Sequence, residues 1–92
     1  MQVNFYATYR QIVGKKTVEI PLDEGATLSQ LVENLVGDYP ALRSEWLDDQ
    51  GHLYGHVHLF VNGRDLPFLE NALDTRLQAD DTVSVFPPVG GG

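Results

Sequence analysis

The sequence has 92 residues, a formal net charge of −7, 42% hydrophobic residues and no cysteine. This length suits one small domain, and the lack of cysteine excludes disulfides, thiolate zinc sites and a cysteine nucleophile. The negative charge disfavours nucleic acid as a partner, because its phosphates would be repelled. No apolar run is long enough to span a membrane, and the N-terminus lacks a signal-peptide pattern, so we expect a cytoplasmic protein that binds no membrane.

Two alternating runs near the N-terminus predict an antiparallel hairpin. Apolar and polar side chains alternate over residues 3–9, and residues 17–22 repeat the pattern. A turn around residues 14–16 would join the two strands. The side chains expected on one face of this hairpin are Val3, Phe5, Ala7, Val18, Ile20 and Leu22.

Residues 27–36 carry the clearest helix signal in the chain. Thr27 and Gln30 match a capping box, in which each side chain bonds the backbone N–H of the other residue. Gly37 stands where a C-terminal cap is expected, and Pro40 prevents continuation. The apolar residues at helical spacing, which predict one buried face, are Leu28, Leu31, Val32, Leu35 and Val36.

The segment after this helix is less regular. Residues 40–47 predict a further helical turn that buries Leu42, Trp46 and Leu47, and residues 48–51 predict a loop.

The rest of the chain predicts strands and turns in the order that completes a small sheet. Strands are expected over residues 56–61 and 82–86, with a hairpin turn at Asn62-Gly63. Leu66-Pro67 is at most a short edge strand, and residues 71–73 predict one helical turn. The whole order predicts an α+β fold in which one main helix packs on one face of a mixed sheet.

The sequence ends on Phe86-Pro87-Pro88-Val89-Gly90-Gly91-Gly92. The two prolines lack backbone N–H groups and would stop the preceding strand, while glycine has the greatest conformational freedom to lose on ordering. We therefore expect a domain over residues 1–87 and a flexible tail over residues 88–92. Without side chains at its end, such a tail could enter a narrow slot in another protein, where Gly92 would carry the chemistry.

Three parts of the sequence resemble motifs of known proteins. Phe5-Tyr6-Ala7, followed by Arg10 and Val13-Gly14, resembles the first strand and turn of molybdopterin synthase small subunits. Val61-Asn62-Gly63 resembles the mid-chain hairpin of that family and of its archaeal modifier relatives. The run from Asp80-Asp81-Thr82-Val83 to the terminal glycines resembles their C-terminal signature. The chain therefore resembles the MoaD/ThiS-like ubiquitin-like sulfur carrier family, and the resemblance implies a ubiquitin-like β-grasp fold.

The resemblance also implies a function that begins at the C-terminus. An E1-like adenylating enzyme would use ATP to activate the Gly92 carboxylate, and sulfur from a persulfide would then give a thiocarboxylate. In this reading the chain binds no cofactor, is not itself an enzyme, and is the small subunit of molybdopterin synthase, whose large subunit receives the tail through Pro87, Pro88, Val89, Gly90 and Gly91.

Three other readings stay open. The chain could be a ubiquitin-like modifier that joins Gly92 to lysines of target proteins, or a sulfur donor for thiazole or tRNA thiolation. It could also be a β-grasp binding module with an inert tail.

One face of the predicted sheet is a candidate binding surface. If the apolar strand residues face the helix, alternation places Tyr6, His58, Phe60, Ser84 and Phe86 on the other side. Aromatic side chains gathered on an open sheet face are typical of a partner interface. Arg10 is a further partner-binding candidate, because it could pair with an acidic group; a solvated loop arginine is the alternative.

A metal site and a catalytic site are both weaker hypotheses. His56 and His58 would point the same way on a strand, but a third ligand would have to come from His52 or the loop carboxylates, so we expect no metal. Ser29 and Ser44 have no histidine or acid placed by a motif, and no glycine-rich phosphate loop precedes a helix.

Overall fold

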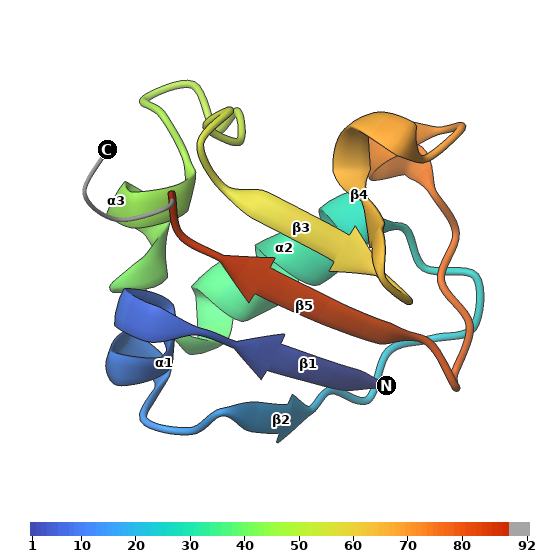
Figure 1. Cartoon of the computed structure of the whole chain (residues 1–92), viewed down its shortest axis with the longest axis horizontal. Coiled ribbons are helices and arrows are strands. Elements are labelled where there is room, and N and C mark those ends of the chain that lie inside the picture. Colours follow the sequence, from blue (N-terminus) through green and yellow to red (C-terminus); the bar gives the residue numbers. More distant parts are fainter. Residues whose placement is uncertain (89–92) are drawn as a thin grey trace.

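The computed structural model describes residues 1–88, in which a five-stranded mixed sheet carries one long helix on one face (Figure 1). The strands are β1 (Gln2–Phe5), β2 (Thr17–Glu19), β3 (His58–Val61), β4 (Arg64–Asp65) and β5 (Thr82–Phe86). The helices are α1 (Ala7–Val13), α2 (Leu28–Asp38) and α3 (Leu42–Trp46), with 3₁₀ turns η1 (Leu66–Phe68) and η2 (Ala72–Asp74).

The strand order is β2-β1-β5-β3-β4, which puts the first and last strands of the chain side by side in the middle of the sheet. β1 and β5 run parallel, and the other neighbouring pairs are antiparallel. The structure confirms the predicted ubiquitin-like β-grasp arrangement, an α+β fold with one main helix on a mixed sheet.

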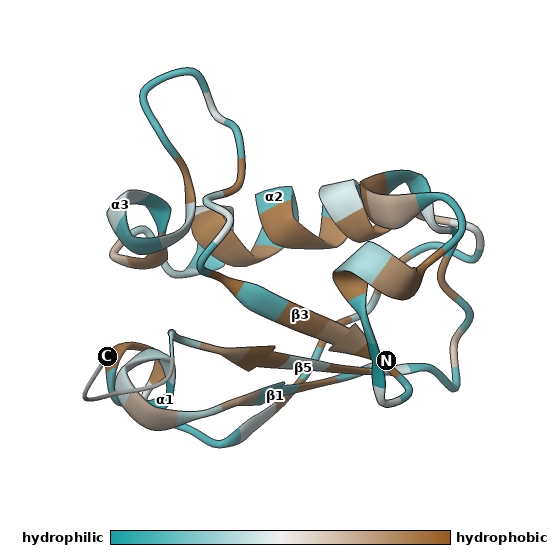
Figure 2. Ribbon diagram, turned by 45° about the horizontal axis from the view of Figure 1, so that its top comes forward, coloured by the Kyte–Doolittle hydropathy of each residue, from teal (hydrophilic) through white to brown (hydrophobic). Residues whose placement is uncertain are grey.

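The main core lies between α2 and the sheet. Figure 2 shows α2 running along one side of the strands with its apolar residues turned toward them. From the strands come Val3, Phe5, Leu59, Val61, Val83 and Val85; from α2 come Leu28, Leu31, Val32, Leu35 and Val36. The predicted capping box is confirmed, because the Gln30 N–H donates to Thr27 Oγ1 and the Thr27 N–H donates to Gln30 Oε1.

The predicted first strand is wrong beyond Phe5. Ala7, whose φ is 52°, begins α1, and Gly14, with a φ of 87°, caps the C-terminal end of this helix. Tyr9 of α1 is fully buried and lies edge-on to Trp46 of α3, with ring centroids 5.6 Å apart. This contact with a distant part of the chain favours a short helix where local alternation predicts a strand.

Smaller boundary predictions are also corrected. α2 continues through Gly37 to Asp38, and Tyr39 is its C-cap. The helix ends there because Pro40 disfavours helical backbone at the residue before it. β3 begins at His58 rather than His56. Leu66-Pro67 begins the 3₁₀ turn η1 instead of an edge strand, since proline cannot donate to a strand ladder.

Other predictions are confirmed. Leu42, Trp46 and Leu47 are buried, and Asn62-Gly63 forms the two-residue turn between β3 and β4 with positive φ at both positions. The predicted helical turn near residues 71–73 is η2. Within residues 1–88, no helix has the length and apolar character needed to cross a bilayer.

Candidate functional site

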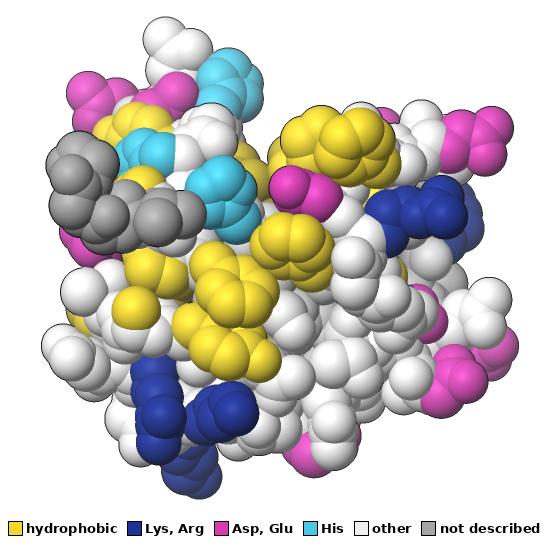
Figure 3. Space-filling view, in the orientation of Figure 1, with side chains coloured by type: hydrophobic (Ala, Val, Ile, Leu, Met, Phe, Trp, Pro, Cys, Tyr) yellow, Lys and Arg dark blue, Asp and Glu magenta, His cyan; other side chains and the backbone are white. Residues whose placement is uncertain are grey.

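Three aromatic rings lie together on the sheet face opposite α2. Tyr6 stacks on Phe86 with centroids 4.1 Å apart and planes 8° apart. Phe60 meets Phe86 edge-on, with centroids 5.4 Å apart and an interplanar angle of 83°. We call Tyr6, Phe60 and Phe86 the aromatic face; Figure 3 shows hydrophobic side chains gathered on this side of the molecule. All three side chains are half-buried, so each keeps surface available to a partner.

The aromatic face follows from strand alternation and register. Val85 is fully buried toward α2, so its neighbour Phe86 points to the other side of the sheet. In the ladder Phe86 pairs with His58, and Phe60 stands two residues further along β3, within diagonal contact of the Phe86 ring. Tyr6 continues the extended backbone of β1 for one residue, and its N–H donates to the Val85 carbonyl at 3.3 Å.

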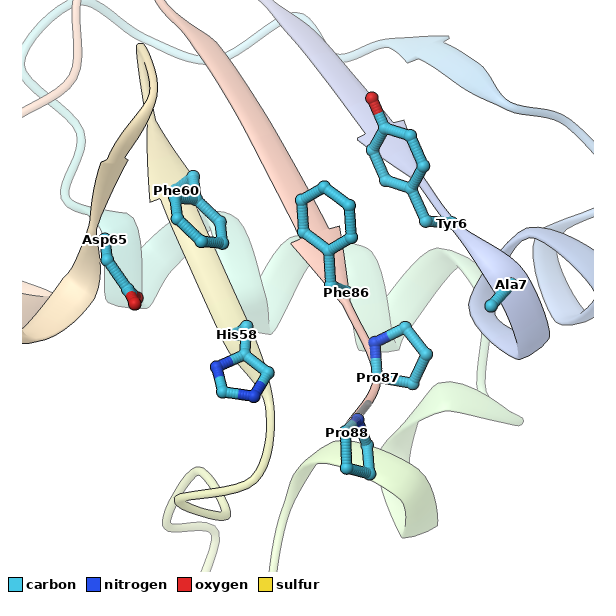
Figure 4. A pocket seen from close by; sticks show the side chains of 8 residues that line it. All are labelled: Tyr6, Ala7, His58, Phe60, Asp65, Phe86, Pro87 and Pro88. Atoms are coloured by element: carbon cyan, nitrogen blue, oxygen red, sulfur yellow. The ribbon is translucent and has the colours of Figure 1, made fainter. Parts of the chain in front are cut away.

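A shallow apolar hollow of about 510 Å³ lies over these rings (Figure 4). Its lining comprises Tyr6, Ala7, His58, Phe60, Asp65, Phe86, Pro87 and Pro88. The two prolines lie where the chain leaves β5, so the hollow adjoins the root of the tail. A protein that covers this face would therefore also lie close to Pro87 and Pro88.

The predicted partner-binding residues do not all lie together. Tyr6, His58, Phe60 and Phe86 share the hollow, which confirms that they lie on one face; their role in binding stays a prediction. Arg10 lies on α1 instead of in a loop and lines a separate hollow with Ala7, Gln11 and Gly14. Its side chain is exposed, so it could reach a partner only beyond the edge of the aromatic face.

Two of the tail residues predicted to insert into a partner are described by the structure. Pro87 is half-buried and Pro88 exposed. The predictions for Val89, Gly90, Gly91 and Gly92, including the flexibility of the tail, fall outside the described residues.

Three residues on or beside this face were missing from the sequence prediction. Lys16 Nζ lies 5.5 Å from the Tyr6 ring centroid, and Asp65 pairs with Phe60 across the β3–β4 ladder. Phe68 in η1 is 75% exposed and borders a second hollow that also includes Phe60. The two-residue turn could have given the Asp65 position, because it fixes the hairpin register; nothing local indicates where Lys16 lies.

The three histidines lie in different surroundings. His52 Nδ1 is 3.8 Å from Asp48 Oδ2, His56 stacks on Tyr54 at 5.0 Å, and His58 lines the aromatic hollow. Within the described residues, no three histidine or carboxylate side chains come together as metal ligands.

Two groups outside the aromatic face, Asp48 and Tyr9, have shifted pKa values. Backbone N–H groups of His52 and Gln50 donate to Asp48 Oδ1, each at 2.9 Å, and these hydrogen bonds lower the pKa of the Asp48 carboxyl. Burial, with a contribution from the Glu45 carboxylate, raises the pKa of the Tyr9 phenol. Neither group touches the aromatic face, so both shifts belong to the fold rather than to this site.

Comparisons with known proteins agree with the observed fold and identify the family. The ThiS family model matches residues 3–92. Small archaeal modifier protein 3 of Haloferax volcanii is 36% identical over 92 residues, covering all of this chain and 98% of that protein. The crystal structure of SAMP1 from Haloferax volcanii matches with a TM-score of 0.88 and 35% identity, covering 100% of this chain and 98% of the other.

A third similar structure carries a different description. It is a putative molybdopterin converting factor subunit 1 from Pyrococcus furiosus, with a TM-score of 0.74 and 32% identity, covering 96% of this chain and 95% of the other. These similarities confirm the resemblance drawn from the sequence motifs. The chain belongs to the ThiS family.

Proposed function

We propose that this chain is a ubiquitin-like modifier and sulfur carrier that acts through an activated carboxylate at Gly92. The observation that carries the proposal is the position of the aromatic face, beside Pro87 and Pro88 where the chain leaves the sheet. An exposed apolar surface usually marks a protein interface. Here that interface would hold the domain while the tail reaches a reaction centre supplied by the partner, so the chain itself needs no catalytic residues.

The chemistry has two stages. The Gly92 carboxylate is a poor electrophile, and its attack on the α-phosphate of ATP, with release of pyrophosphate, converts it into an acyl adenylate. A lysine amine of a target protein then displaces AMP and forms an isopeptide bond. Alternatively, a protein persulfide displaces AMP and a second thiol cleaves the S–S bond, leaving a thiocarboxylate. An E1-like adenylating enzyme in the cytoplasm would bind the ATP.

The relatives favour the modifier reading over a role restricted to molybdopterin synthesis. Small archaeal modifier protein 3 is 36% identical over the full length of this chain. The similar SAMP1 structure points the same way. We therefore place conjugation to target lysines first, which reverses the order expected from the sequence motifs alone.

The second candidate function is the small subunit of molybdopterin synthase. It is favoured by the 32% identity to the putative molybdopterin converting factor subunit from Pyrococcus furiosus. In this role the thiocarboxylate at Gly92 would donate its sulfur inside the large subunit. Both functions share the adenylation step and diverge only in what displaces AMP.

The test is intact mass spectrometry after incubation with ATP, a cognate activating enzyme and either a persulfide donor or a cell extract. Exchange of one oxygen for sulfur at Gly92 indicates the carrier role. Conjugation to lysines indicates the modifier role, and trypsin would leave residues 77–92 on each target, because Arg76 is the last basic residue of the sequence. No modification by an enzyme that is active on another carrier would refute the proposal, and the chain lacking Gly92 is the matched control.

A further inference from the structure

The aromatic face is part of a longer strip with opposite charges at its two ends. Asp65 pairs with Phe60, Phe60 contacts Phe86, and Phe86 stacks on Tyr6. Beyond Tyr6, Lys16 Nζ lies over the ring at 5.5 Å. In Figure 4 the side chains of Asp65, Phe60, Phe86 and Tyr6 follow one another across neighbouring strands. The strip therefore runs from an anion to a cation over three rings.

The acidic end is available to a partner. Asp65 is half-buried at the edge of the hollow, and its carboxylate forms no ion pair or side-chain hydrogen bond within residues 1–88. Its neighbour Arg64 pairs with Val61 and lines the second hollow together with Phe60 and Asp65, but no ion pair joins Arg64 to Asp65 within residues 1–88. The carboxylate thus faces the aromatic side without its own counter-ion.

The basic end stands out against the rest of the molecule. The sequence has six lysine and arginine residues against thirteen acidic ones, yet Arg10, Lys15 and Lys16 lie in or just after α1. Figure 3 shows basic side chains directly beside the hydrophobic cluster. The Phe5 N–H donates to the Lys16 carbonyl at 2.7 Å, so the Lys16 backbone is fixed to the end of β1.

We infer that this strip orients the activating enzyme on the domain, through an apolar centre flanked by a carboxylate that faces Lys16 and a cation that faces Asp65. This inference rests on the proposed function and adds to it the chemistry of the partner's surface. A partner protein could bind to the three rings alone in either of two opposite orientations. Two opposite charges at their ends favour one orientation, because reversal of the partner would place like charges together. The favoured orientation fixes the direction in which the tail leaves toward the active centre.

The test uses ATP–pyrophosphate exchange by the cognate activating enzyme, with the KM for this chain as the readout. Lys16→Glu and Asp65→Lys should each raise the KM about tenfold with little change in kcat, because both place like charges at the contact. The matched controls are Arg43→Glu and Asp80→Lys, which make the same changes in net charge at exposed positions outside the strip. Each control should stay within about twofold of the wild type.

A second variant separates the charge of Lys16 from its packing. Lys16→Met keeps an apolar stem over Tyr6 and removes the cation, so the KM should rise about threefold and depend less on salt than the wild-type KM. Equal effects of the charge reversals and their controls, or an effect at one end only, would overturn the inference. A normal KM with impaired transfer from Gly92 would assign the strip to a later partner and overturn the choice of the activating enzyme. No exchange with the wild-type chain would instead refute the proposed function, and the inference with it.

Discussion

Truncation of Phe60 is the sharpest test that the aromatic face serves binding rather than stability. Phe60 makes one ring contact, to Phe86, whereas Phe86 makes two, to Tyr6 and Phe60. An aromatic pair contributes about 0.5–1.5 kcal/mol beyond its buried area. Phe60→Ala should therefore lower the free energy of unfolding by about 1–2 kcal/mol. Phe86→Ala would remove two ring contacts, so its effect on binding could not be separated from its effect on stability.

The expected effect on docking is larger. An aromatic hot-spot residue of an interface typically contributes about 2 kcal/mol or more, which corresponds to an increase of roughly 30-fold in the KM for this chain. The stability change should lower the melting temperature by roughly 4–8 °C per kcal/mol for a domain of this size. Both quantities are measurable on one protein preparation, by pyrophosphate exchange with the activating enzyme and by thermal unfolding followed with circular dichroism.

The control for Phe60→Ala is Leu31→Ala. Leu31 is 1% exposed on α2, on the opposite side of the sheet, so its truncation should destabilise the fold and leave the KM of the folded protein unchanged. A large loss of stability in Phe60→Ala with a normal KM would mean that the ring belongs to the core. An unchanged KM with little loss of stability would mean that the aromatic face has no part in docking.

Four further outcomes are expected. Deletion of Gly92 should abolish adenylation, as seen by intact mass, while leaving the melting temperature unchanged. Leu31→Ala should cost about 2–5 kcal/mol in denaturant unfolding through the cavity it leaves; a negligible cost would contradict its burial. Thr75→Val should raise the free energy of unfolding by about 1 kcal/mol, because Thr75 Oγ1 is buried without a hydrogen-bond partner among the described residues. The lowered pKa of Asp48 means that its hydrogen bonds stabilise the fold above the ordinary aspartate range and stop doing so as pH falls through the folded pKa. Thermal melts should therefore show Asp48→Asn less stable than the wild type near neutral pH, with the gap closing in acid; a constant gap would contradict the assignment.

The parts of the fold that the sequence predicted are those decided by neighbouring residues. The capping box of Thr27 and Gln30 and the apolar spacing of α2 are local, and both are confirmed. The turn at Asn62-Gly63 is local as well, because both positions adopt positive φ. Alternation along β5 likewise placed Phe86 on the face away from α2, and with it most of the candidate site.

The parts that the sequence did not predict depend on distant contacts. α1 is only seven residues long, and a helix of that length is marginal unless tertiary packing supports it. That support comes from the burial of Tyr9 against Trp46, which lies far along the chain. The position of Lys16 over Tyr6 depends in turn on α1, because the helix returns the chain to the start of β2. Because the sequence predicted that the first strand continues to residue 9, it did not predict α1. The position of Lys16 over Tyr6 could therefore not be predicted either.

Two features of β5 put the proposed docking surface beside the point where the chain leaves the sheet. Val83 and Val85 are fully buried against α2, so the strand is firmly held in the middle of the sheet. Phe86 is its last residue, and it pairs with His58 at the first residue of β3. Pro87 then has no N–H with which to extend a ladder, so the chain leaves the sheet directly after the central ring of the aromatic face. A partner that binds this ring is therefore fixed relative to the root of the tail, and a substitution on the aromatic face should disturb the positioning of Gly92 without reaching the core.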